Sequence, residues 1–338
     1  MGVLAPAPLA PEAVTPELIC GATSVRWGAP RRSAKCMTVT LRLNTFSRPS
    51  LLLAAQHQGF LEEEGVALEV IFAKGSRAQM EGLLAGQWEL AHTNVDNVMK
   101  FRGQGYDGLF VFLVADRGIG QKLVVHPDIK GWDDLRDRAV GVDAPDSGYA
   151  FVVYELLDRH GLPWGSYEVK PLGATSYRLD GLRSGAVVAG LLSHEYEVSA
   201  LDEGFTVIAD TRDHFPQLAG VTGATTRSWA NDNDELLHGY TRAVLAAARW
   251  TQDEANEDSL VELVARARRI PEAEAQRLLD LERAARTGGV PSADEAADSL
   301  RGFARLRGKA TGMQPAECFN PRYMRAALEG ARTGVTSR

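Results

Sequence analysis

Cysteine is scarce in this 338-residue chain, which contains only Cys20, Cys36 and Cys318. Their number is odd and no two form a Cys-x-x-Cys pair, so the sequence encodes neither a disulfide framework nor a cysteine zinc site. The seven histidines are scattered without the spacing of metal ligands, and no G-x-S-x-G or phosphate-loop motif occurs. We therefore expect no metal and no cofactor.

Long apolar runs and dense basic runs are also missing. No apolar stretch approaches the roughly 20 residues that a membrane-spanning helix needs. The 37 Lys and Arg residues are outnumbered by 44 Asp and Glu, giving a net charge of -7, and no Lys/Arg run could follow a phosphate backbone. Direct membrane insertion and nucleic-acid binding are therefore not expected. The composition, 45% hydrophobic and 24% charged, is typical of a globular protein with about two domains.

The first 37 residues resemble a mobile leader. Residues 1–35 contain five prolines and no sustained periodicity, which predicts an extended segment. A secretory signal would need a basic start followed by roughly 7–15 apolar residues, and this pattern is missing. The chain as written is thus expected in the cytoplasm. A true start elsewhere, with Met37 as one candidate, would allow a periplasmic protein.

Strand and helix patterns alternate from Thr38 onward in two similar blocks. In the first block, strands are predicted at 38–46, 68–72 and 90–94, and helices at 51–61 and 76–85. In the second block, which begins at 123, strands are predicted at 140–142, 169–172 and 187–192, and helices at 147–160 and 176–184. Such alternation predicts an α/β fold in which mostly parallel sheets are flanked by helices.

The two blocks share a unit in which a helix ends at a glycine before a strand. Leu83-Leu84-Ala85-Gly86 in the first block corresponds to Leu182-Arg183-Ser184-Gly185 in the second. This repetition predicts two similar α/β lobes. Helices are predicted after them at 234–252, 259–269, 272–285 and 293–307. They are expected to pack on the first lobe, whose sheet otherwise has too few helices to cover it.

Several strings resemble one known family. They are Leu43-Asn44-Thr45-Phe46, the segment from Leu53 to Val66 (LAAQHQGFLEEEGV), Leu84-Ala85-Gly86-Gln87-Trp88-Glu89-Leu90-Ala91, Val95-Asp96-Asn97-Val98, the segment from Trp132 to Val142 (WDDLRDRAVGV) and Asn231-Asp232-Asn233-Asp234-Glu235. Over Thr38 to about Gln252, the chain resembles the solute-binding proteins of ABC importers for nitrate, sulfonates, taurine and thiamine-type pyrimidines.

The resemblance implies a two-lobed periplasmic-binding-protein type II fold with a small-molecule ligand in the cleft. The extra C-terminal helices would lie on the first lobe, and an ABC permease would be the partner. Two crossing segments, near 114–121 and 215–221, would join the lobes. The first lobe would then comprise residues 38–117 and 218–330, and the second lobe residues 118–217.

Small or hydroxyl residues open three predicted helices directly after strands. They stand in Gly75-Ser76, Asp146-Ser147-Gly148-Tyr149 and Ala174-Thr175-Ser176. In open α/β sheets ligands bind beyond the carboxyl ends of the strands, where helix N-termini present free N–H groups. Ser76, Ser147 and Thr175 could instead serve only as helix N-caps. Three such sites together favour a polar or anionic ligand.

Further candidates follow other strand ends. Arg48 could pair with a carboxylate or sulfonate, Asn94 ends the third strand, and Asp96 is a reasonable helix N-cap. Tyr149 could stack on a flat ring. The predicted ligand-binding residues are Arg48, Ser76, Asn94, Asp146, Ser147, Tyr149, Thr175, Ser193, His194 and Glu195.

Enzymes also use this scaffold. An enzyme that resembles the yeast-type pyrimidine precursor synthase would have a lysine and a histidine at two positions where this chain has Thr93 and Asn97. The sulfinate-releasing relatives would have a cysteine at the position of Phe46. This sequence has none of these three residues there. No catalytic residue is therefore predicted.

The favoured function is a solute-binding protein that closes on a sulfonate, carboxylate or pyrimidine for ABC import. The alternative is a cytoplasmic lyase, decarboxylase or hydrolase acting on a small aromatic or heterocyclic acid, with His194, Glu195 or Asp146 as acid–base groups.

Overall fold

The structure is a computed structural model. It describes residues 38–115, 120–192, 195–216, 218–220, 222–285, 290–306 and 315–333. The predicted leader, residues 1–37, lies outside the described residues. The predicted lobe boundaries, at 117/118 and 217/218, fall at or beside residues that are also outside, so they stay predictions.

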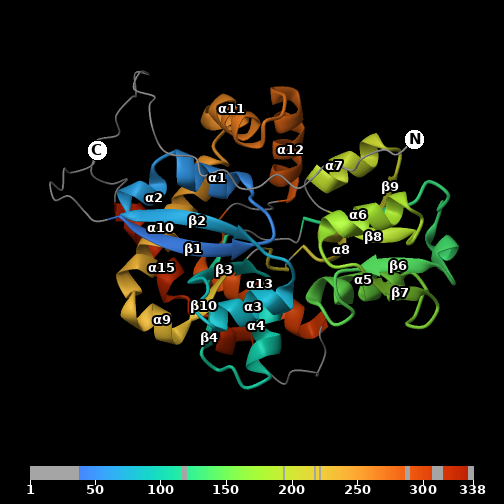
Figure 1. The fold of residues 1–338 in the computed structure, drawn as a ribbon, viewed down its shortest axis with the longest axis horizontal. Coiled ribbons are helices and arrows are strands. Elements are labelled where there is room, and N and C mark those ends of the chain that lie inside the picture. Colours follow the sequence, from blue (N-terminus) through green and yellow to red (C-terminus); the bar gives the residue numbers. More distant parts are fainter. Residues whose placement is uncertain are drawn as a thin grey trace, which may run out of the picture. The chain divides into compact units, whose positions relative to one another are not determined.

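The first lobe is built on a five-stranded sheet of order β2-β1-β3-β10-β4 (Figure 1). Its strands are β1 (Val39–Thr45), β2 (Val66–Phe72), β3 (Leu90–Thr93), β4 (Leu109–Val114) and β10 (Thr222–Thr226). β1 pairs in parallel with β2 and β3, whereas β10 is antiparallel to both β3 and β4. Four of the five strands therefore point the same way, as the alternating pattern predicts.

The second lobe repeats this arrangement in the order β7-β6-β8-β5-β9. Its strands are β5 (Lys122–Val125), β6 (Ala139–Val142), β7 (Glu168–Pro171), β8 (Ala189–Leu192) and β9 (Thr206–Asp210). Here β5 is the antiparallel strand. In each sheet the reversed strand is the one that follows a strand of the other sheet along the chain. The chain thus passes twice between the lobes, as in the two-lobed fold that the resemblance implies.

Helices follow the strands on both lobes (Figure 1). The first lobe has α1 (Ser50–His57), α2 (Phe60–Glu63), α3 (Ser76–Leu84) and α4 (Val95–Arg102). The second has a 3-10 turn (Trp132–Leu135), α5 (Gly148–Arg159), α6 (Thr175–Arg183), α7 (Glu195–Asp202) and α8 (Thr211–His214). The predicted glycine stops are confirmed, because Gly86 and Gly185 follow α3 and α6 with φ of 68° and 70°, the left-handed conformation that ends helices.

The C-terminal part is helical. It comprises α9 (Arg227–Asp232), α10 (Asp234–Trp250), a 3-10 turn (Glu254–Asn256), α11 (Glu257–Arg268), α12 (Glu272–Ala285), α13 (Ala293–Leu306), α14 (Pro315–Cys318) and α15 (Arg322–Thr333). α10 packs on α1, α2 and α15, and α15 packs on β4, as expected for helices that cover the first lobe. α12 also contacts α7, and α13 contacts α5, so these two helices touch the second lobe as well.

The edge strand β4 of the first sheet is covered by the C-terminal helices. All six residues of β4 are buried although β4 is an edge strand, because α15 covers it and Asn320 N–H donates to Val111 O at 2.9 Å. The Phe112 ring meets Tyr240 of α10 and Tyr323 of α15 edge-to-face, with centroids 6.1 and 6.2 Å apart. Covering an edge in this way removes a surface that would otherwise pair with another chain.

Within the described residues, no helix has the length and apolar character required to span a bilayer.

Candidate ligand-binding site

A cavity of about 390 Å³ lies between the two lobes, at the carboxyl ends of their parallel strands. The first lobe contributes Thr45, Phe46, Ser47, Ala73, Gly75, Ser76, Arg77, His92, Thr93, Asn94, Asp96 and Asn97. The second lobe contributes Asp143, Ala144, Ser147, Gly148, Tyr149, Gly173, Ala174, Thr175, Ser176, Arg178 and Tyr196, and the segments beside the crossings add Gly120, Gln121 and Gly220. This is the place where open α/β sheets bind ligands.

Five of the predicted residues line this cavity: Ser76, Asn94, Ser147, Tyr149 and Thr175. Ser147 is also an N-cap, because its Oγ accepts a 3.0 Å hydrogen bond from Ala150 N–H. Asn94, rather than Asp96, caps α4 by accepting from Asp96 N–H at 3.0 Å. Asn94 and Ser147 are therefore both helix caps and cavity-wall residues. The role of the five wall residues as ligand contacts stays a prediction.

Ser76 and Thr175 are not N-caps. α3 begins after Gly75 and α6 after Ala174, and neither helix has a side-chain cap. Thr175 Oγ1 instead accepts a 2.9 Å hydrogen bond from Arg178 Nη2. The cavity wall thus contains two helix starts whose N-cap residues, Gly75 and Ala174, provide no side-chain cap.

Two predicted residues lie away from the cavity. Arg48 donates from Nε to Gln56 Oε1 at 3.0 Å, so its guanidinium turns toward α1 instead of the cleft. Burial is the main cause that lowers the Arg48 pKa, with Arg268 adding to it. Asp146 forms an ion pair with Lys100 of α4 and leaves 62% of its side chain exposed. Neither residue lines the cavity.

The last three predicted residues cannot be placed as side chains. Ser193 and His194 lie outside the described residues, and Glu195 is described only as the first residue of α7. Their neighbour Tyr196 does line the cavity.

Arg178 is a wall residue that the sequence reasoning missed. Arg178 is only 4% exposed. Its guanidinium donates three hydrogen bonds, to Leu191 O at 2.8 Å, Gly173 O at 2.6 Å and Thr175 Oγ1 at 2.9 Å. Burial is the main cause that lowers its pKa. One signal could have found it: Arg178 shares the buried helical face of Leu179 and Leu182, an unusual position for a charged residue.

Asp96 and Lys100 join the lobes through α4. The Asp96 carboxylate accepts a 2.8 Å hydrogen bond from Gly148 N–H at the start of α5, and Asp96 is 1% exposed. One turn further along α4, Lys100 pairs with Asp146. Both contacts reach the same strand-to-helix connection of the second lobe, which brings the two cavity walls together.

Two buried polar atoms on the wall have no hydrogen-bond partner among the described residues. They are Asn94 Nδ2, a donor, and Gln121 Oε1, an acceptor. Their residues are 6% and 7% exposed. Buried polar groups are rarely left unpaired because each costs about 1–3 kcal/mol. A ligand that pairs with both groups would remove this cost.

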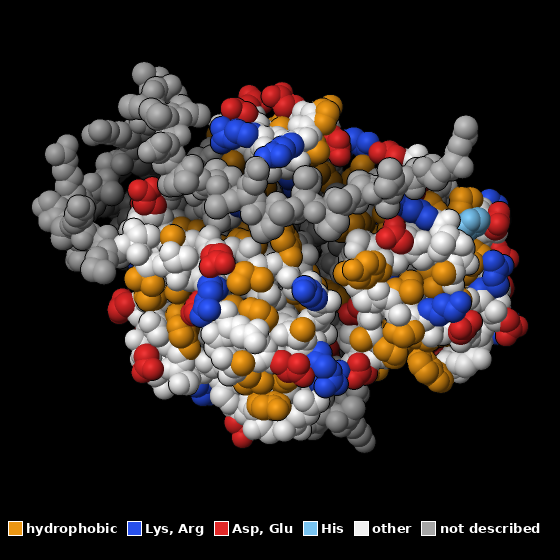
Figure 2. All heavy atoms as spheres, in the orientation of Figure 1, with side chains coloured by type: hydrophobic (Ala, Val, Ile, Leu, Met, Phe, Trp, Pro, Cys, Tyr) orange, Lys and Arg blue, Asp and Glu red, His pale blue; other side chains and the backbone are white. Residues whose placement is uncertain are grey.

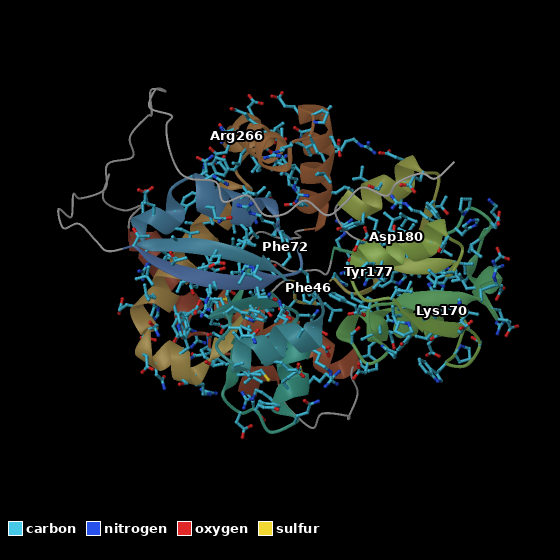
Figure 3. All side chains as sticks on the ribbon, in the orientation of Figure 1. Phe46, Phe72, Lys170, Tyr177, Asp180 and Arg266 are labelled. Carbon is cyan, nitrogen blue, oxygen red and sulfur yellow. The ribbon has the colours of Figure 1, made fainter. Side chains whose placement is uncertain are left out.

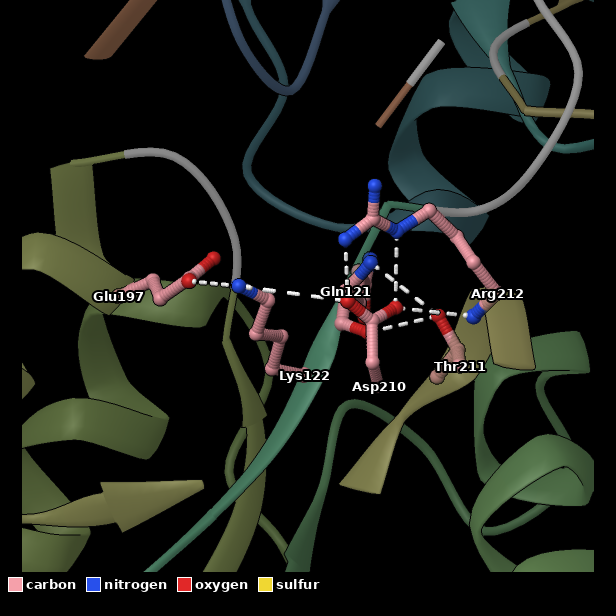
Figure 4. Close-up of polar contacts among 6 residues, drawn as sticks. All are labelled: Gln121, Lys122, Glu197, Asp210, Thr211 and Arg212. Carbon is pink, nitrogen blue, oxygen red and sulfur yellow. Dashed lines mark hydrogen bonds and ion pairs between the residues drawn. The ribbon is translucent and has the colours of Figure 1, made fainter. Parts of the chain in front are cut away.

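The Gln121 backbone is fixed by a polar network (Figure 4). Thr211 Oγ1 donates to Gln121 O at 2.6 Å, while Gln121 N–H donates to Thr211 Oγ1 at 3.2 Å. Beside it, Lys122 pairs with the buried Glu197 at 2.6 Å, and Arg212 Nε donates to Asp210 at 2.9 Å. The network ties together the chain ends that lead into the two crossing segments.

His92 lies on the first-lobe side of the cavity. Its Nε2 forms a 2.9 Å hydrogen bond with the buried Tyr240 hydroxyl, and burial lowers the pKa of His92 to about 4. The imidazole is therefore neutral at pH 7. Among the described residues, no three His, Cys, Asp or Glu side chains are arranged to hold a metal ion.

Aromatic side chains surround the region where the lobes meet. Phe46 and Phe72 of the first lobe and Tyr177 of the second lie there (Figure 3), and they are 45%, 61% and 60% exposed. On the face drawn in Figure 2, acidic and basic side chains are interspersed rather than gathered into one patch. Exposed aromatic rings thus lie at the edge of the cleft.

Solved structures share this fold at low sequence identity. A protein of Bordetella bronchiseptica RB50 is 20% identical with a TM-score of 0.70, covering 88% of this chain and 100% of its own. The alkanesulfonate-binding protein SsuA of Xanthomonas axonopodis pv. citri, bound to MOPS, is 16% identical with a TM-score of 0.67 and coverages of 83% and 98%. The nitrate-binding protein NrtA of Synechocystis PCC 6803 is 12% identical with a TM-score of 0.68 and coverages of 86% and 88%.

These likenesses establish the two-lobed periplasmic-binding-protein fold. Among curated proteins, none matches the sequence significantly. The family model described as the NMT1-like family matches residues 38–265, which is more than half of the chain. The chain therefore belongs to the NMT1-like family.

Proposed function

We propose that this protein is a solute-binding protein whose two lobes enclose a small polar molecule for an ABC importer. The observation that carries the proposal is the cavity between the lobes. Its wall includes two buried polar atoms, Asn94 Nδ2 and Gln121 Oε1, for which the described residues provide no hydrogen-bond partner. A cavity of about 390 Å³ lies within the range of small-molecule sites. The printed names of SsuA and NrtA, which describe binding of alkanesulfonate and nitrate, support binding rather than catalysis.

The permease partner follows from the same proposal. A binding protein delivers its ligand by opening, and the two lobes are connected by two chain crossings about which the lobes can rotate.

No observation favours the lyase or hydrolase alternative. Asp146, one of its three acid–base candidates, is paired with Lys100 outside the cavity.

Native mass spectrometry and a thermal-shift screen would test the proposal. We expect a library of small polar molecules to contain a compound that raises the melting temperature, because it binds only the folded state. Small-angle scattering should then show a smaller radius of gyration with that compound. The compound should be recovered chemically unchanged, and its conversion into a product would contradict the proposal.

A pair of variants links the binding to the cavity. Ser176→Trp places an indole on the cavity wall and should abolish the thermal shift. Glu254→Trp adds the same ring at an exposed position outside the wall and should leave the shift unchanged. Equal binding by both variants would place the ligand elsewhere.

A further inference from the structure

Two C-terminal helices connect the lobes beyond the part of the chain that the family model matches. That match ends at residue 265, before α12 and α13 begin. α12 packs on α11, and Ser50 N–H of α1 donates to Glu282 of α12 at 3.0 Å, which ties α12 to the first lobe. α13 contacts α4 of the same lobe. Both helices also contact the second lobe, α12 through α7 and α13 through α5 (Figure 1).

The two helices reach the second lobe on opposite faces of its sheet. The connection from β6 to β7 runs one way across the parallel strands of order β7-β6-β8, and the connection from β7 to β8 runs the other way. Because such crossovers are right-handed, α5 and α6 lie on opposite faces. α7 packs on α6. α12 therefore contacts the second lobe on one face and α13 contacts it on the other.

An ion pair fixes the contact between α12 and α7. Arg277 donates from Nη2 and Nη1 to the two carboxylate oxygens of Asp202, at 2.8 and 3.1 Å. These hydrogen bonds lower the pKa of Asp202 and raise that of Arg277. The two parallel bonds set the direction of the guanidinium as well as its distance. The side chains are 52% and 56% exposed, so dissolved salt reaches the pair.

A second ion pair joins the lobes with the same polarity. Lys100 of α4 pairs with Asp146, which lies just before α5. In both pairs the cation belongs to the first lobe and the carboxylate to the second. Electrostatic attraction between the lobes therefore opposes their separation at two places, one at α7 and one beside the start of α5.

Attractions of this size matter more for opening than for folding. Exposed ion pairs add little to folding stability, but a balance between two folded arrangements is displaced by small differences in free energy. A rotation about the two crossings separates the pairs without unfolding either lobe. The Debye length falls from about 30 Å at 0.01 M salt to about 3 Å at 1 M, so salt weakens both pairs.

We propose that the pairs Arg277–Asp202 and Lys100–Asp146 form an electrostatic clasp that holds the lobes together in the protein without ligand, so that ionic strength sets how far the cleft opens. The proposal goes beyond the proposed function, because it concerns the empty protein and needs no particular ligand. Ligand then enters when the clasp opens, and α12 carries the part of the clasp that lies outside the matched residues.

Electron spin resonance tests the clasp by measuring the distance across the mouth of the cleft. Spin labels on noncanonical residues at Phe72 and Tyr177 avoid the three cysteines. Both positions are exposed, lie on opposite lobes at the edge of the cleft (Figure 3) and are outside the cavity wall. The distance in the empty full-length protein should be longer at 1 M than at 0.01 M NaCl, while circular dichroism stays unchanged. An equal distance at both salt concentrations would overturn the proposal.

Charge reversal separates the clasp from general effects of salt. Arg277→Asp replaces attraction to Asp202 with repulsion, so the distance should be longer than in the wild type already at 0.01 M NaCl. Combining Arg277→Asp with Asp202→Arg restores an ion pair of reversed polarity and should bring back the wild-type distance. A single variant that matches the wild type, or a double variant that stays open, would overturn the role of this pair.

A matched pair of neutral variants tests the second ion pair. Asp146→Asn removes one carboxylate of the clasp and should lengthen the distance at 0.01 M NaCl. Glu155→Gln removes the same charge from the same lobe, but its partner Arg159, at 2.8 Å, lies within α5, so the distance should not change. Equal lengthening in both variants would show that net charge, and not the clasp, controls opening.

The outcomes are independent of the proposed function. A distance that ignores salt and charge reversal would remove the clasp, while the library screen would still decide whether the protein binds a solute. A screen without any ligand would remove the proposed function and leave the measured distances as they are.

Discussion

The carboxylate of Asp96 accepts a 2.8 Å hydrogen bond from the backbone N–H of Gly148, and this bond connects α4 of the first lobe to the start of α5 in the second. Both residues are buried. The neighbouring ion pair between Lys100 and Asp146 makes the same connection at the surface, where the Asp146 side chain is 62% exposed. The two contacts differ in burial and should therefore differ in their contribution to stability.

Asp96→Ala should lower the free energy of unfolding by about 1–3 kcal/mol, because it leaves Gly148 N–H buried without that acceptor. Asp146→Ala removes the exposed pair and should cost at most about 1 kcal/mol. Urea unfolding followed by circular dichroism would compare the two variants. A larger loss for Asp146→Ala would show that the surface pair, and not the buried bond, is the stronger link.

Glu282→Ala should destabilise the protein by about 3 kcal/mol, since it deprives a buried N–H group and a nearby guanidinium of their carboxylate. The groups concerned are Ser50 N–H at 3.0 Å and Arg268 at 3.6 Å. Sulfate should then bind the vacated N-terminus of α1. We expect sulfate to raise the melting temperature of this variant more than that of the wild type. Equal increases in both proteins would refute an anion site at α1.

The sequence predicts the local parts of this fold well. Each of the two repeated units ends a helix at a glycine, and Gly86 and Gly185 adopt positive φ as expected, because a helix stop depends only on its neighbours. The cavity wall is foreseen in part for a related reason. Asn94 and Ser147 follow parallel strands, whose carboxyl ends lie at one edge of a sheet.

Contacts between distant residues could not be predicted from such patterns. Asp96 and Gly148 are 52 residues apart, and Ser50 and Glu282 are 232 apart, so no periodicity links them. The position of Arg48 after a strand predicts a side chain at the cleft, but the side chain of Gln56 offers an acceptor on the adjacent helix and draws the guanidinium away. A rule about strand ends locates a residue, whereas nearby hydrogen-bond partners decide where its side chain points.

Gly82→Ala should destabilise the protein by about 1–3 kcal/mol through overpacking. An added Cβ would lie 2.2 Å from Trp88 Cζ2, and the indole is held by its hydrogen bond from Nε1 to Gln79 O at 3.0 Å. Gly103→Ala is the control, since its nearest neighbour would be Met99 O at 3.4 Å and its φ of -61° suits alanine. Thermal unfolding should separate the two variants. Similar melting temperatures would mean that Trp88 moves aside at little cost.

His92 should make the protein less stable as the pH falls from 7 to 5. Burial lowers its pKa from 6.5 to about 4 in the folded protein, so the unfolded chain binds the proton more readily. A lowered histidine pKa gives stability that is present above pH 6.5 and is lost as the pH falls toward 4. At about 1.4 kcal/mol per pKa unit, the full loss is about 3 kcal/mol, of which about 2 kcal/mol falls between pH 7 and pH 5.

His92→Gln removes this titration while keeping a side chain that can accept from the Tyr240 hydroxyl, so its stability should vary less with pH. The gap between wild type and variant should therefore shrink by about 2 kcal/mol as the pH falls from 7 to 5. Tyr240→Phe is the matched control, because it breaks the same 2.9 Å hydrogen bond but leaves the histidine in place and should retain the pH dependence. Urea unfolding of the three proteins at several pH values measures both effects. Parallel curves for wild type and His92→Gln would show that His92 does not titrate on unfolding, which would contradict its burial as a neutral imidazole.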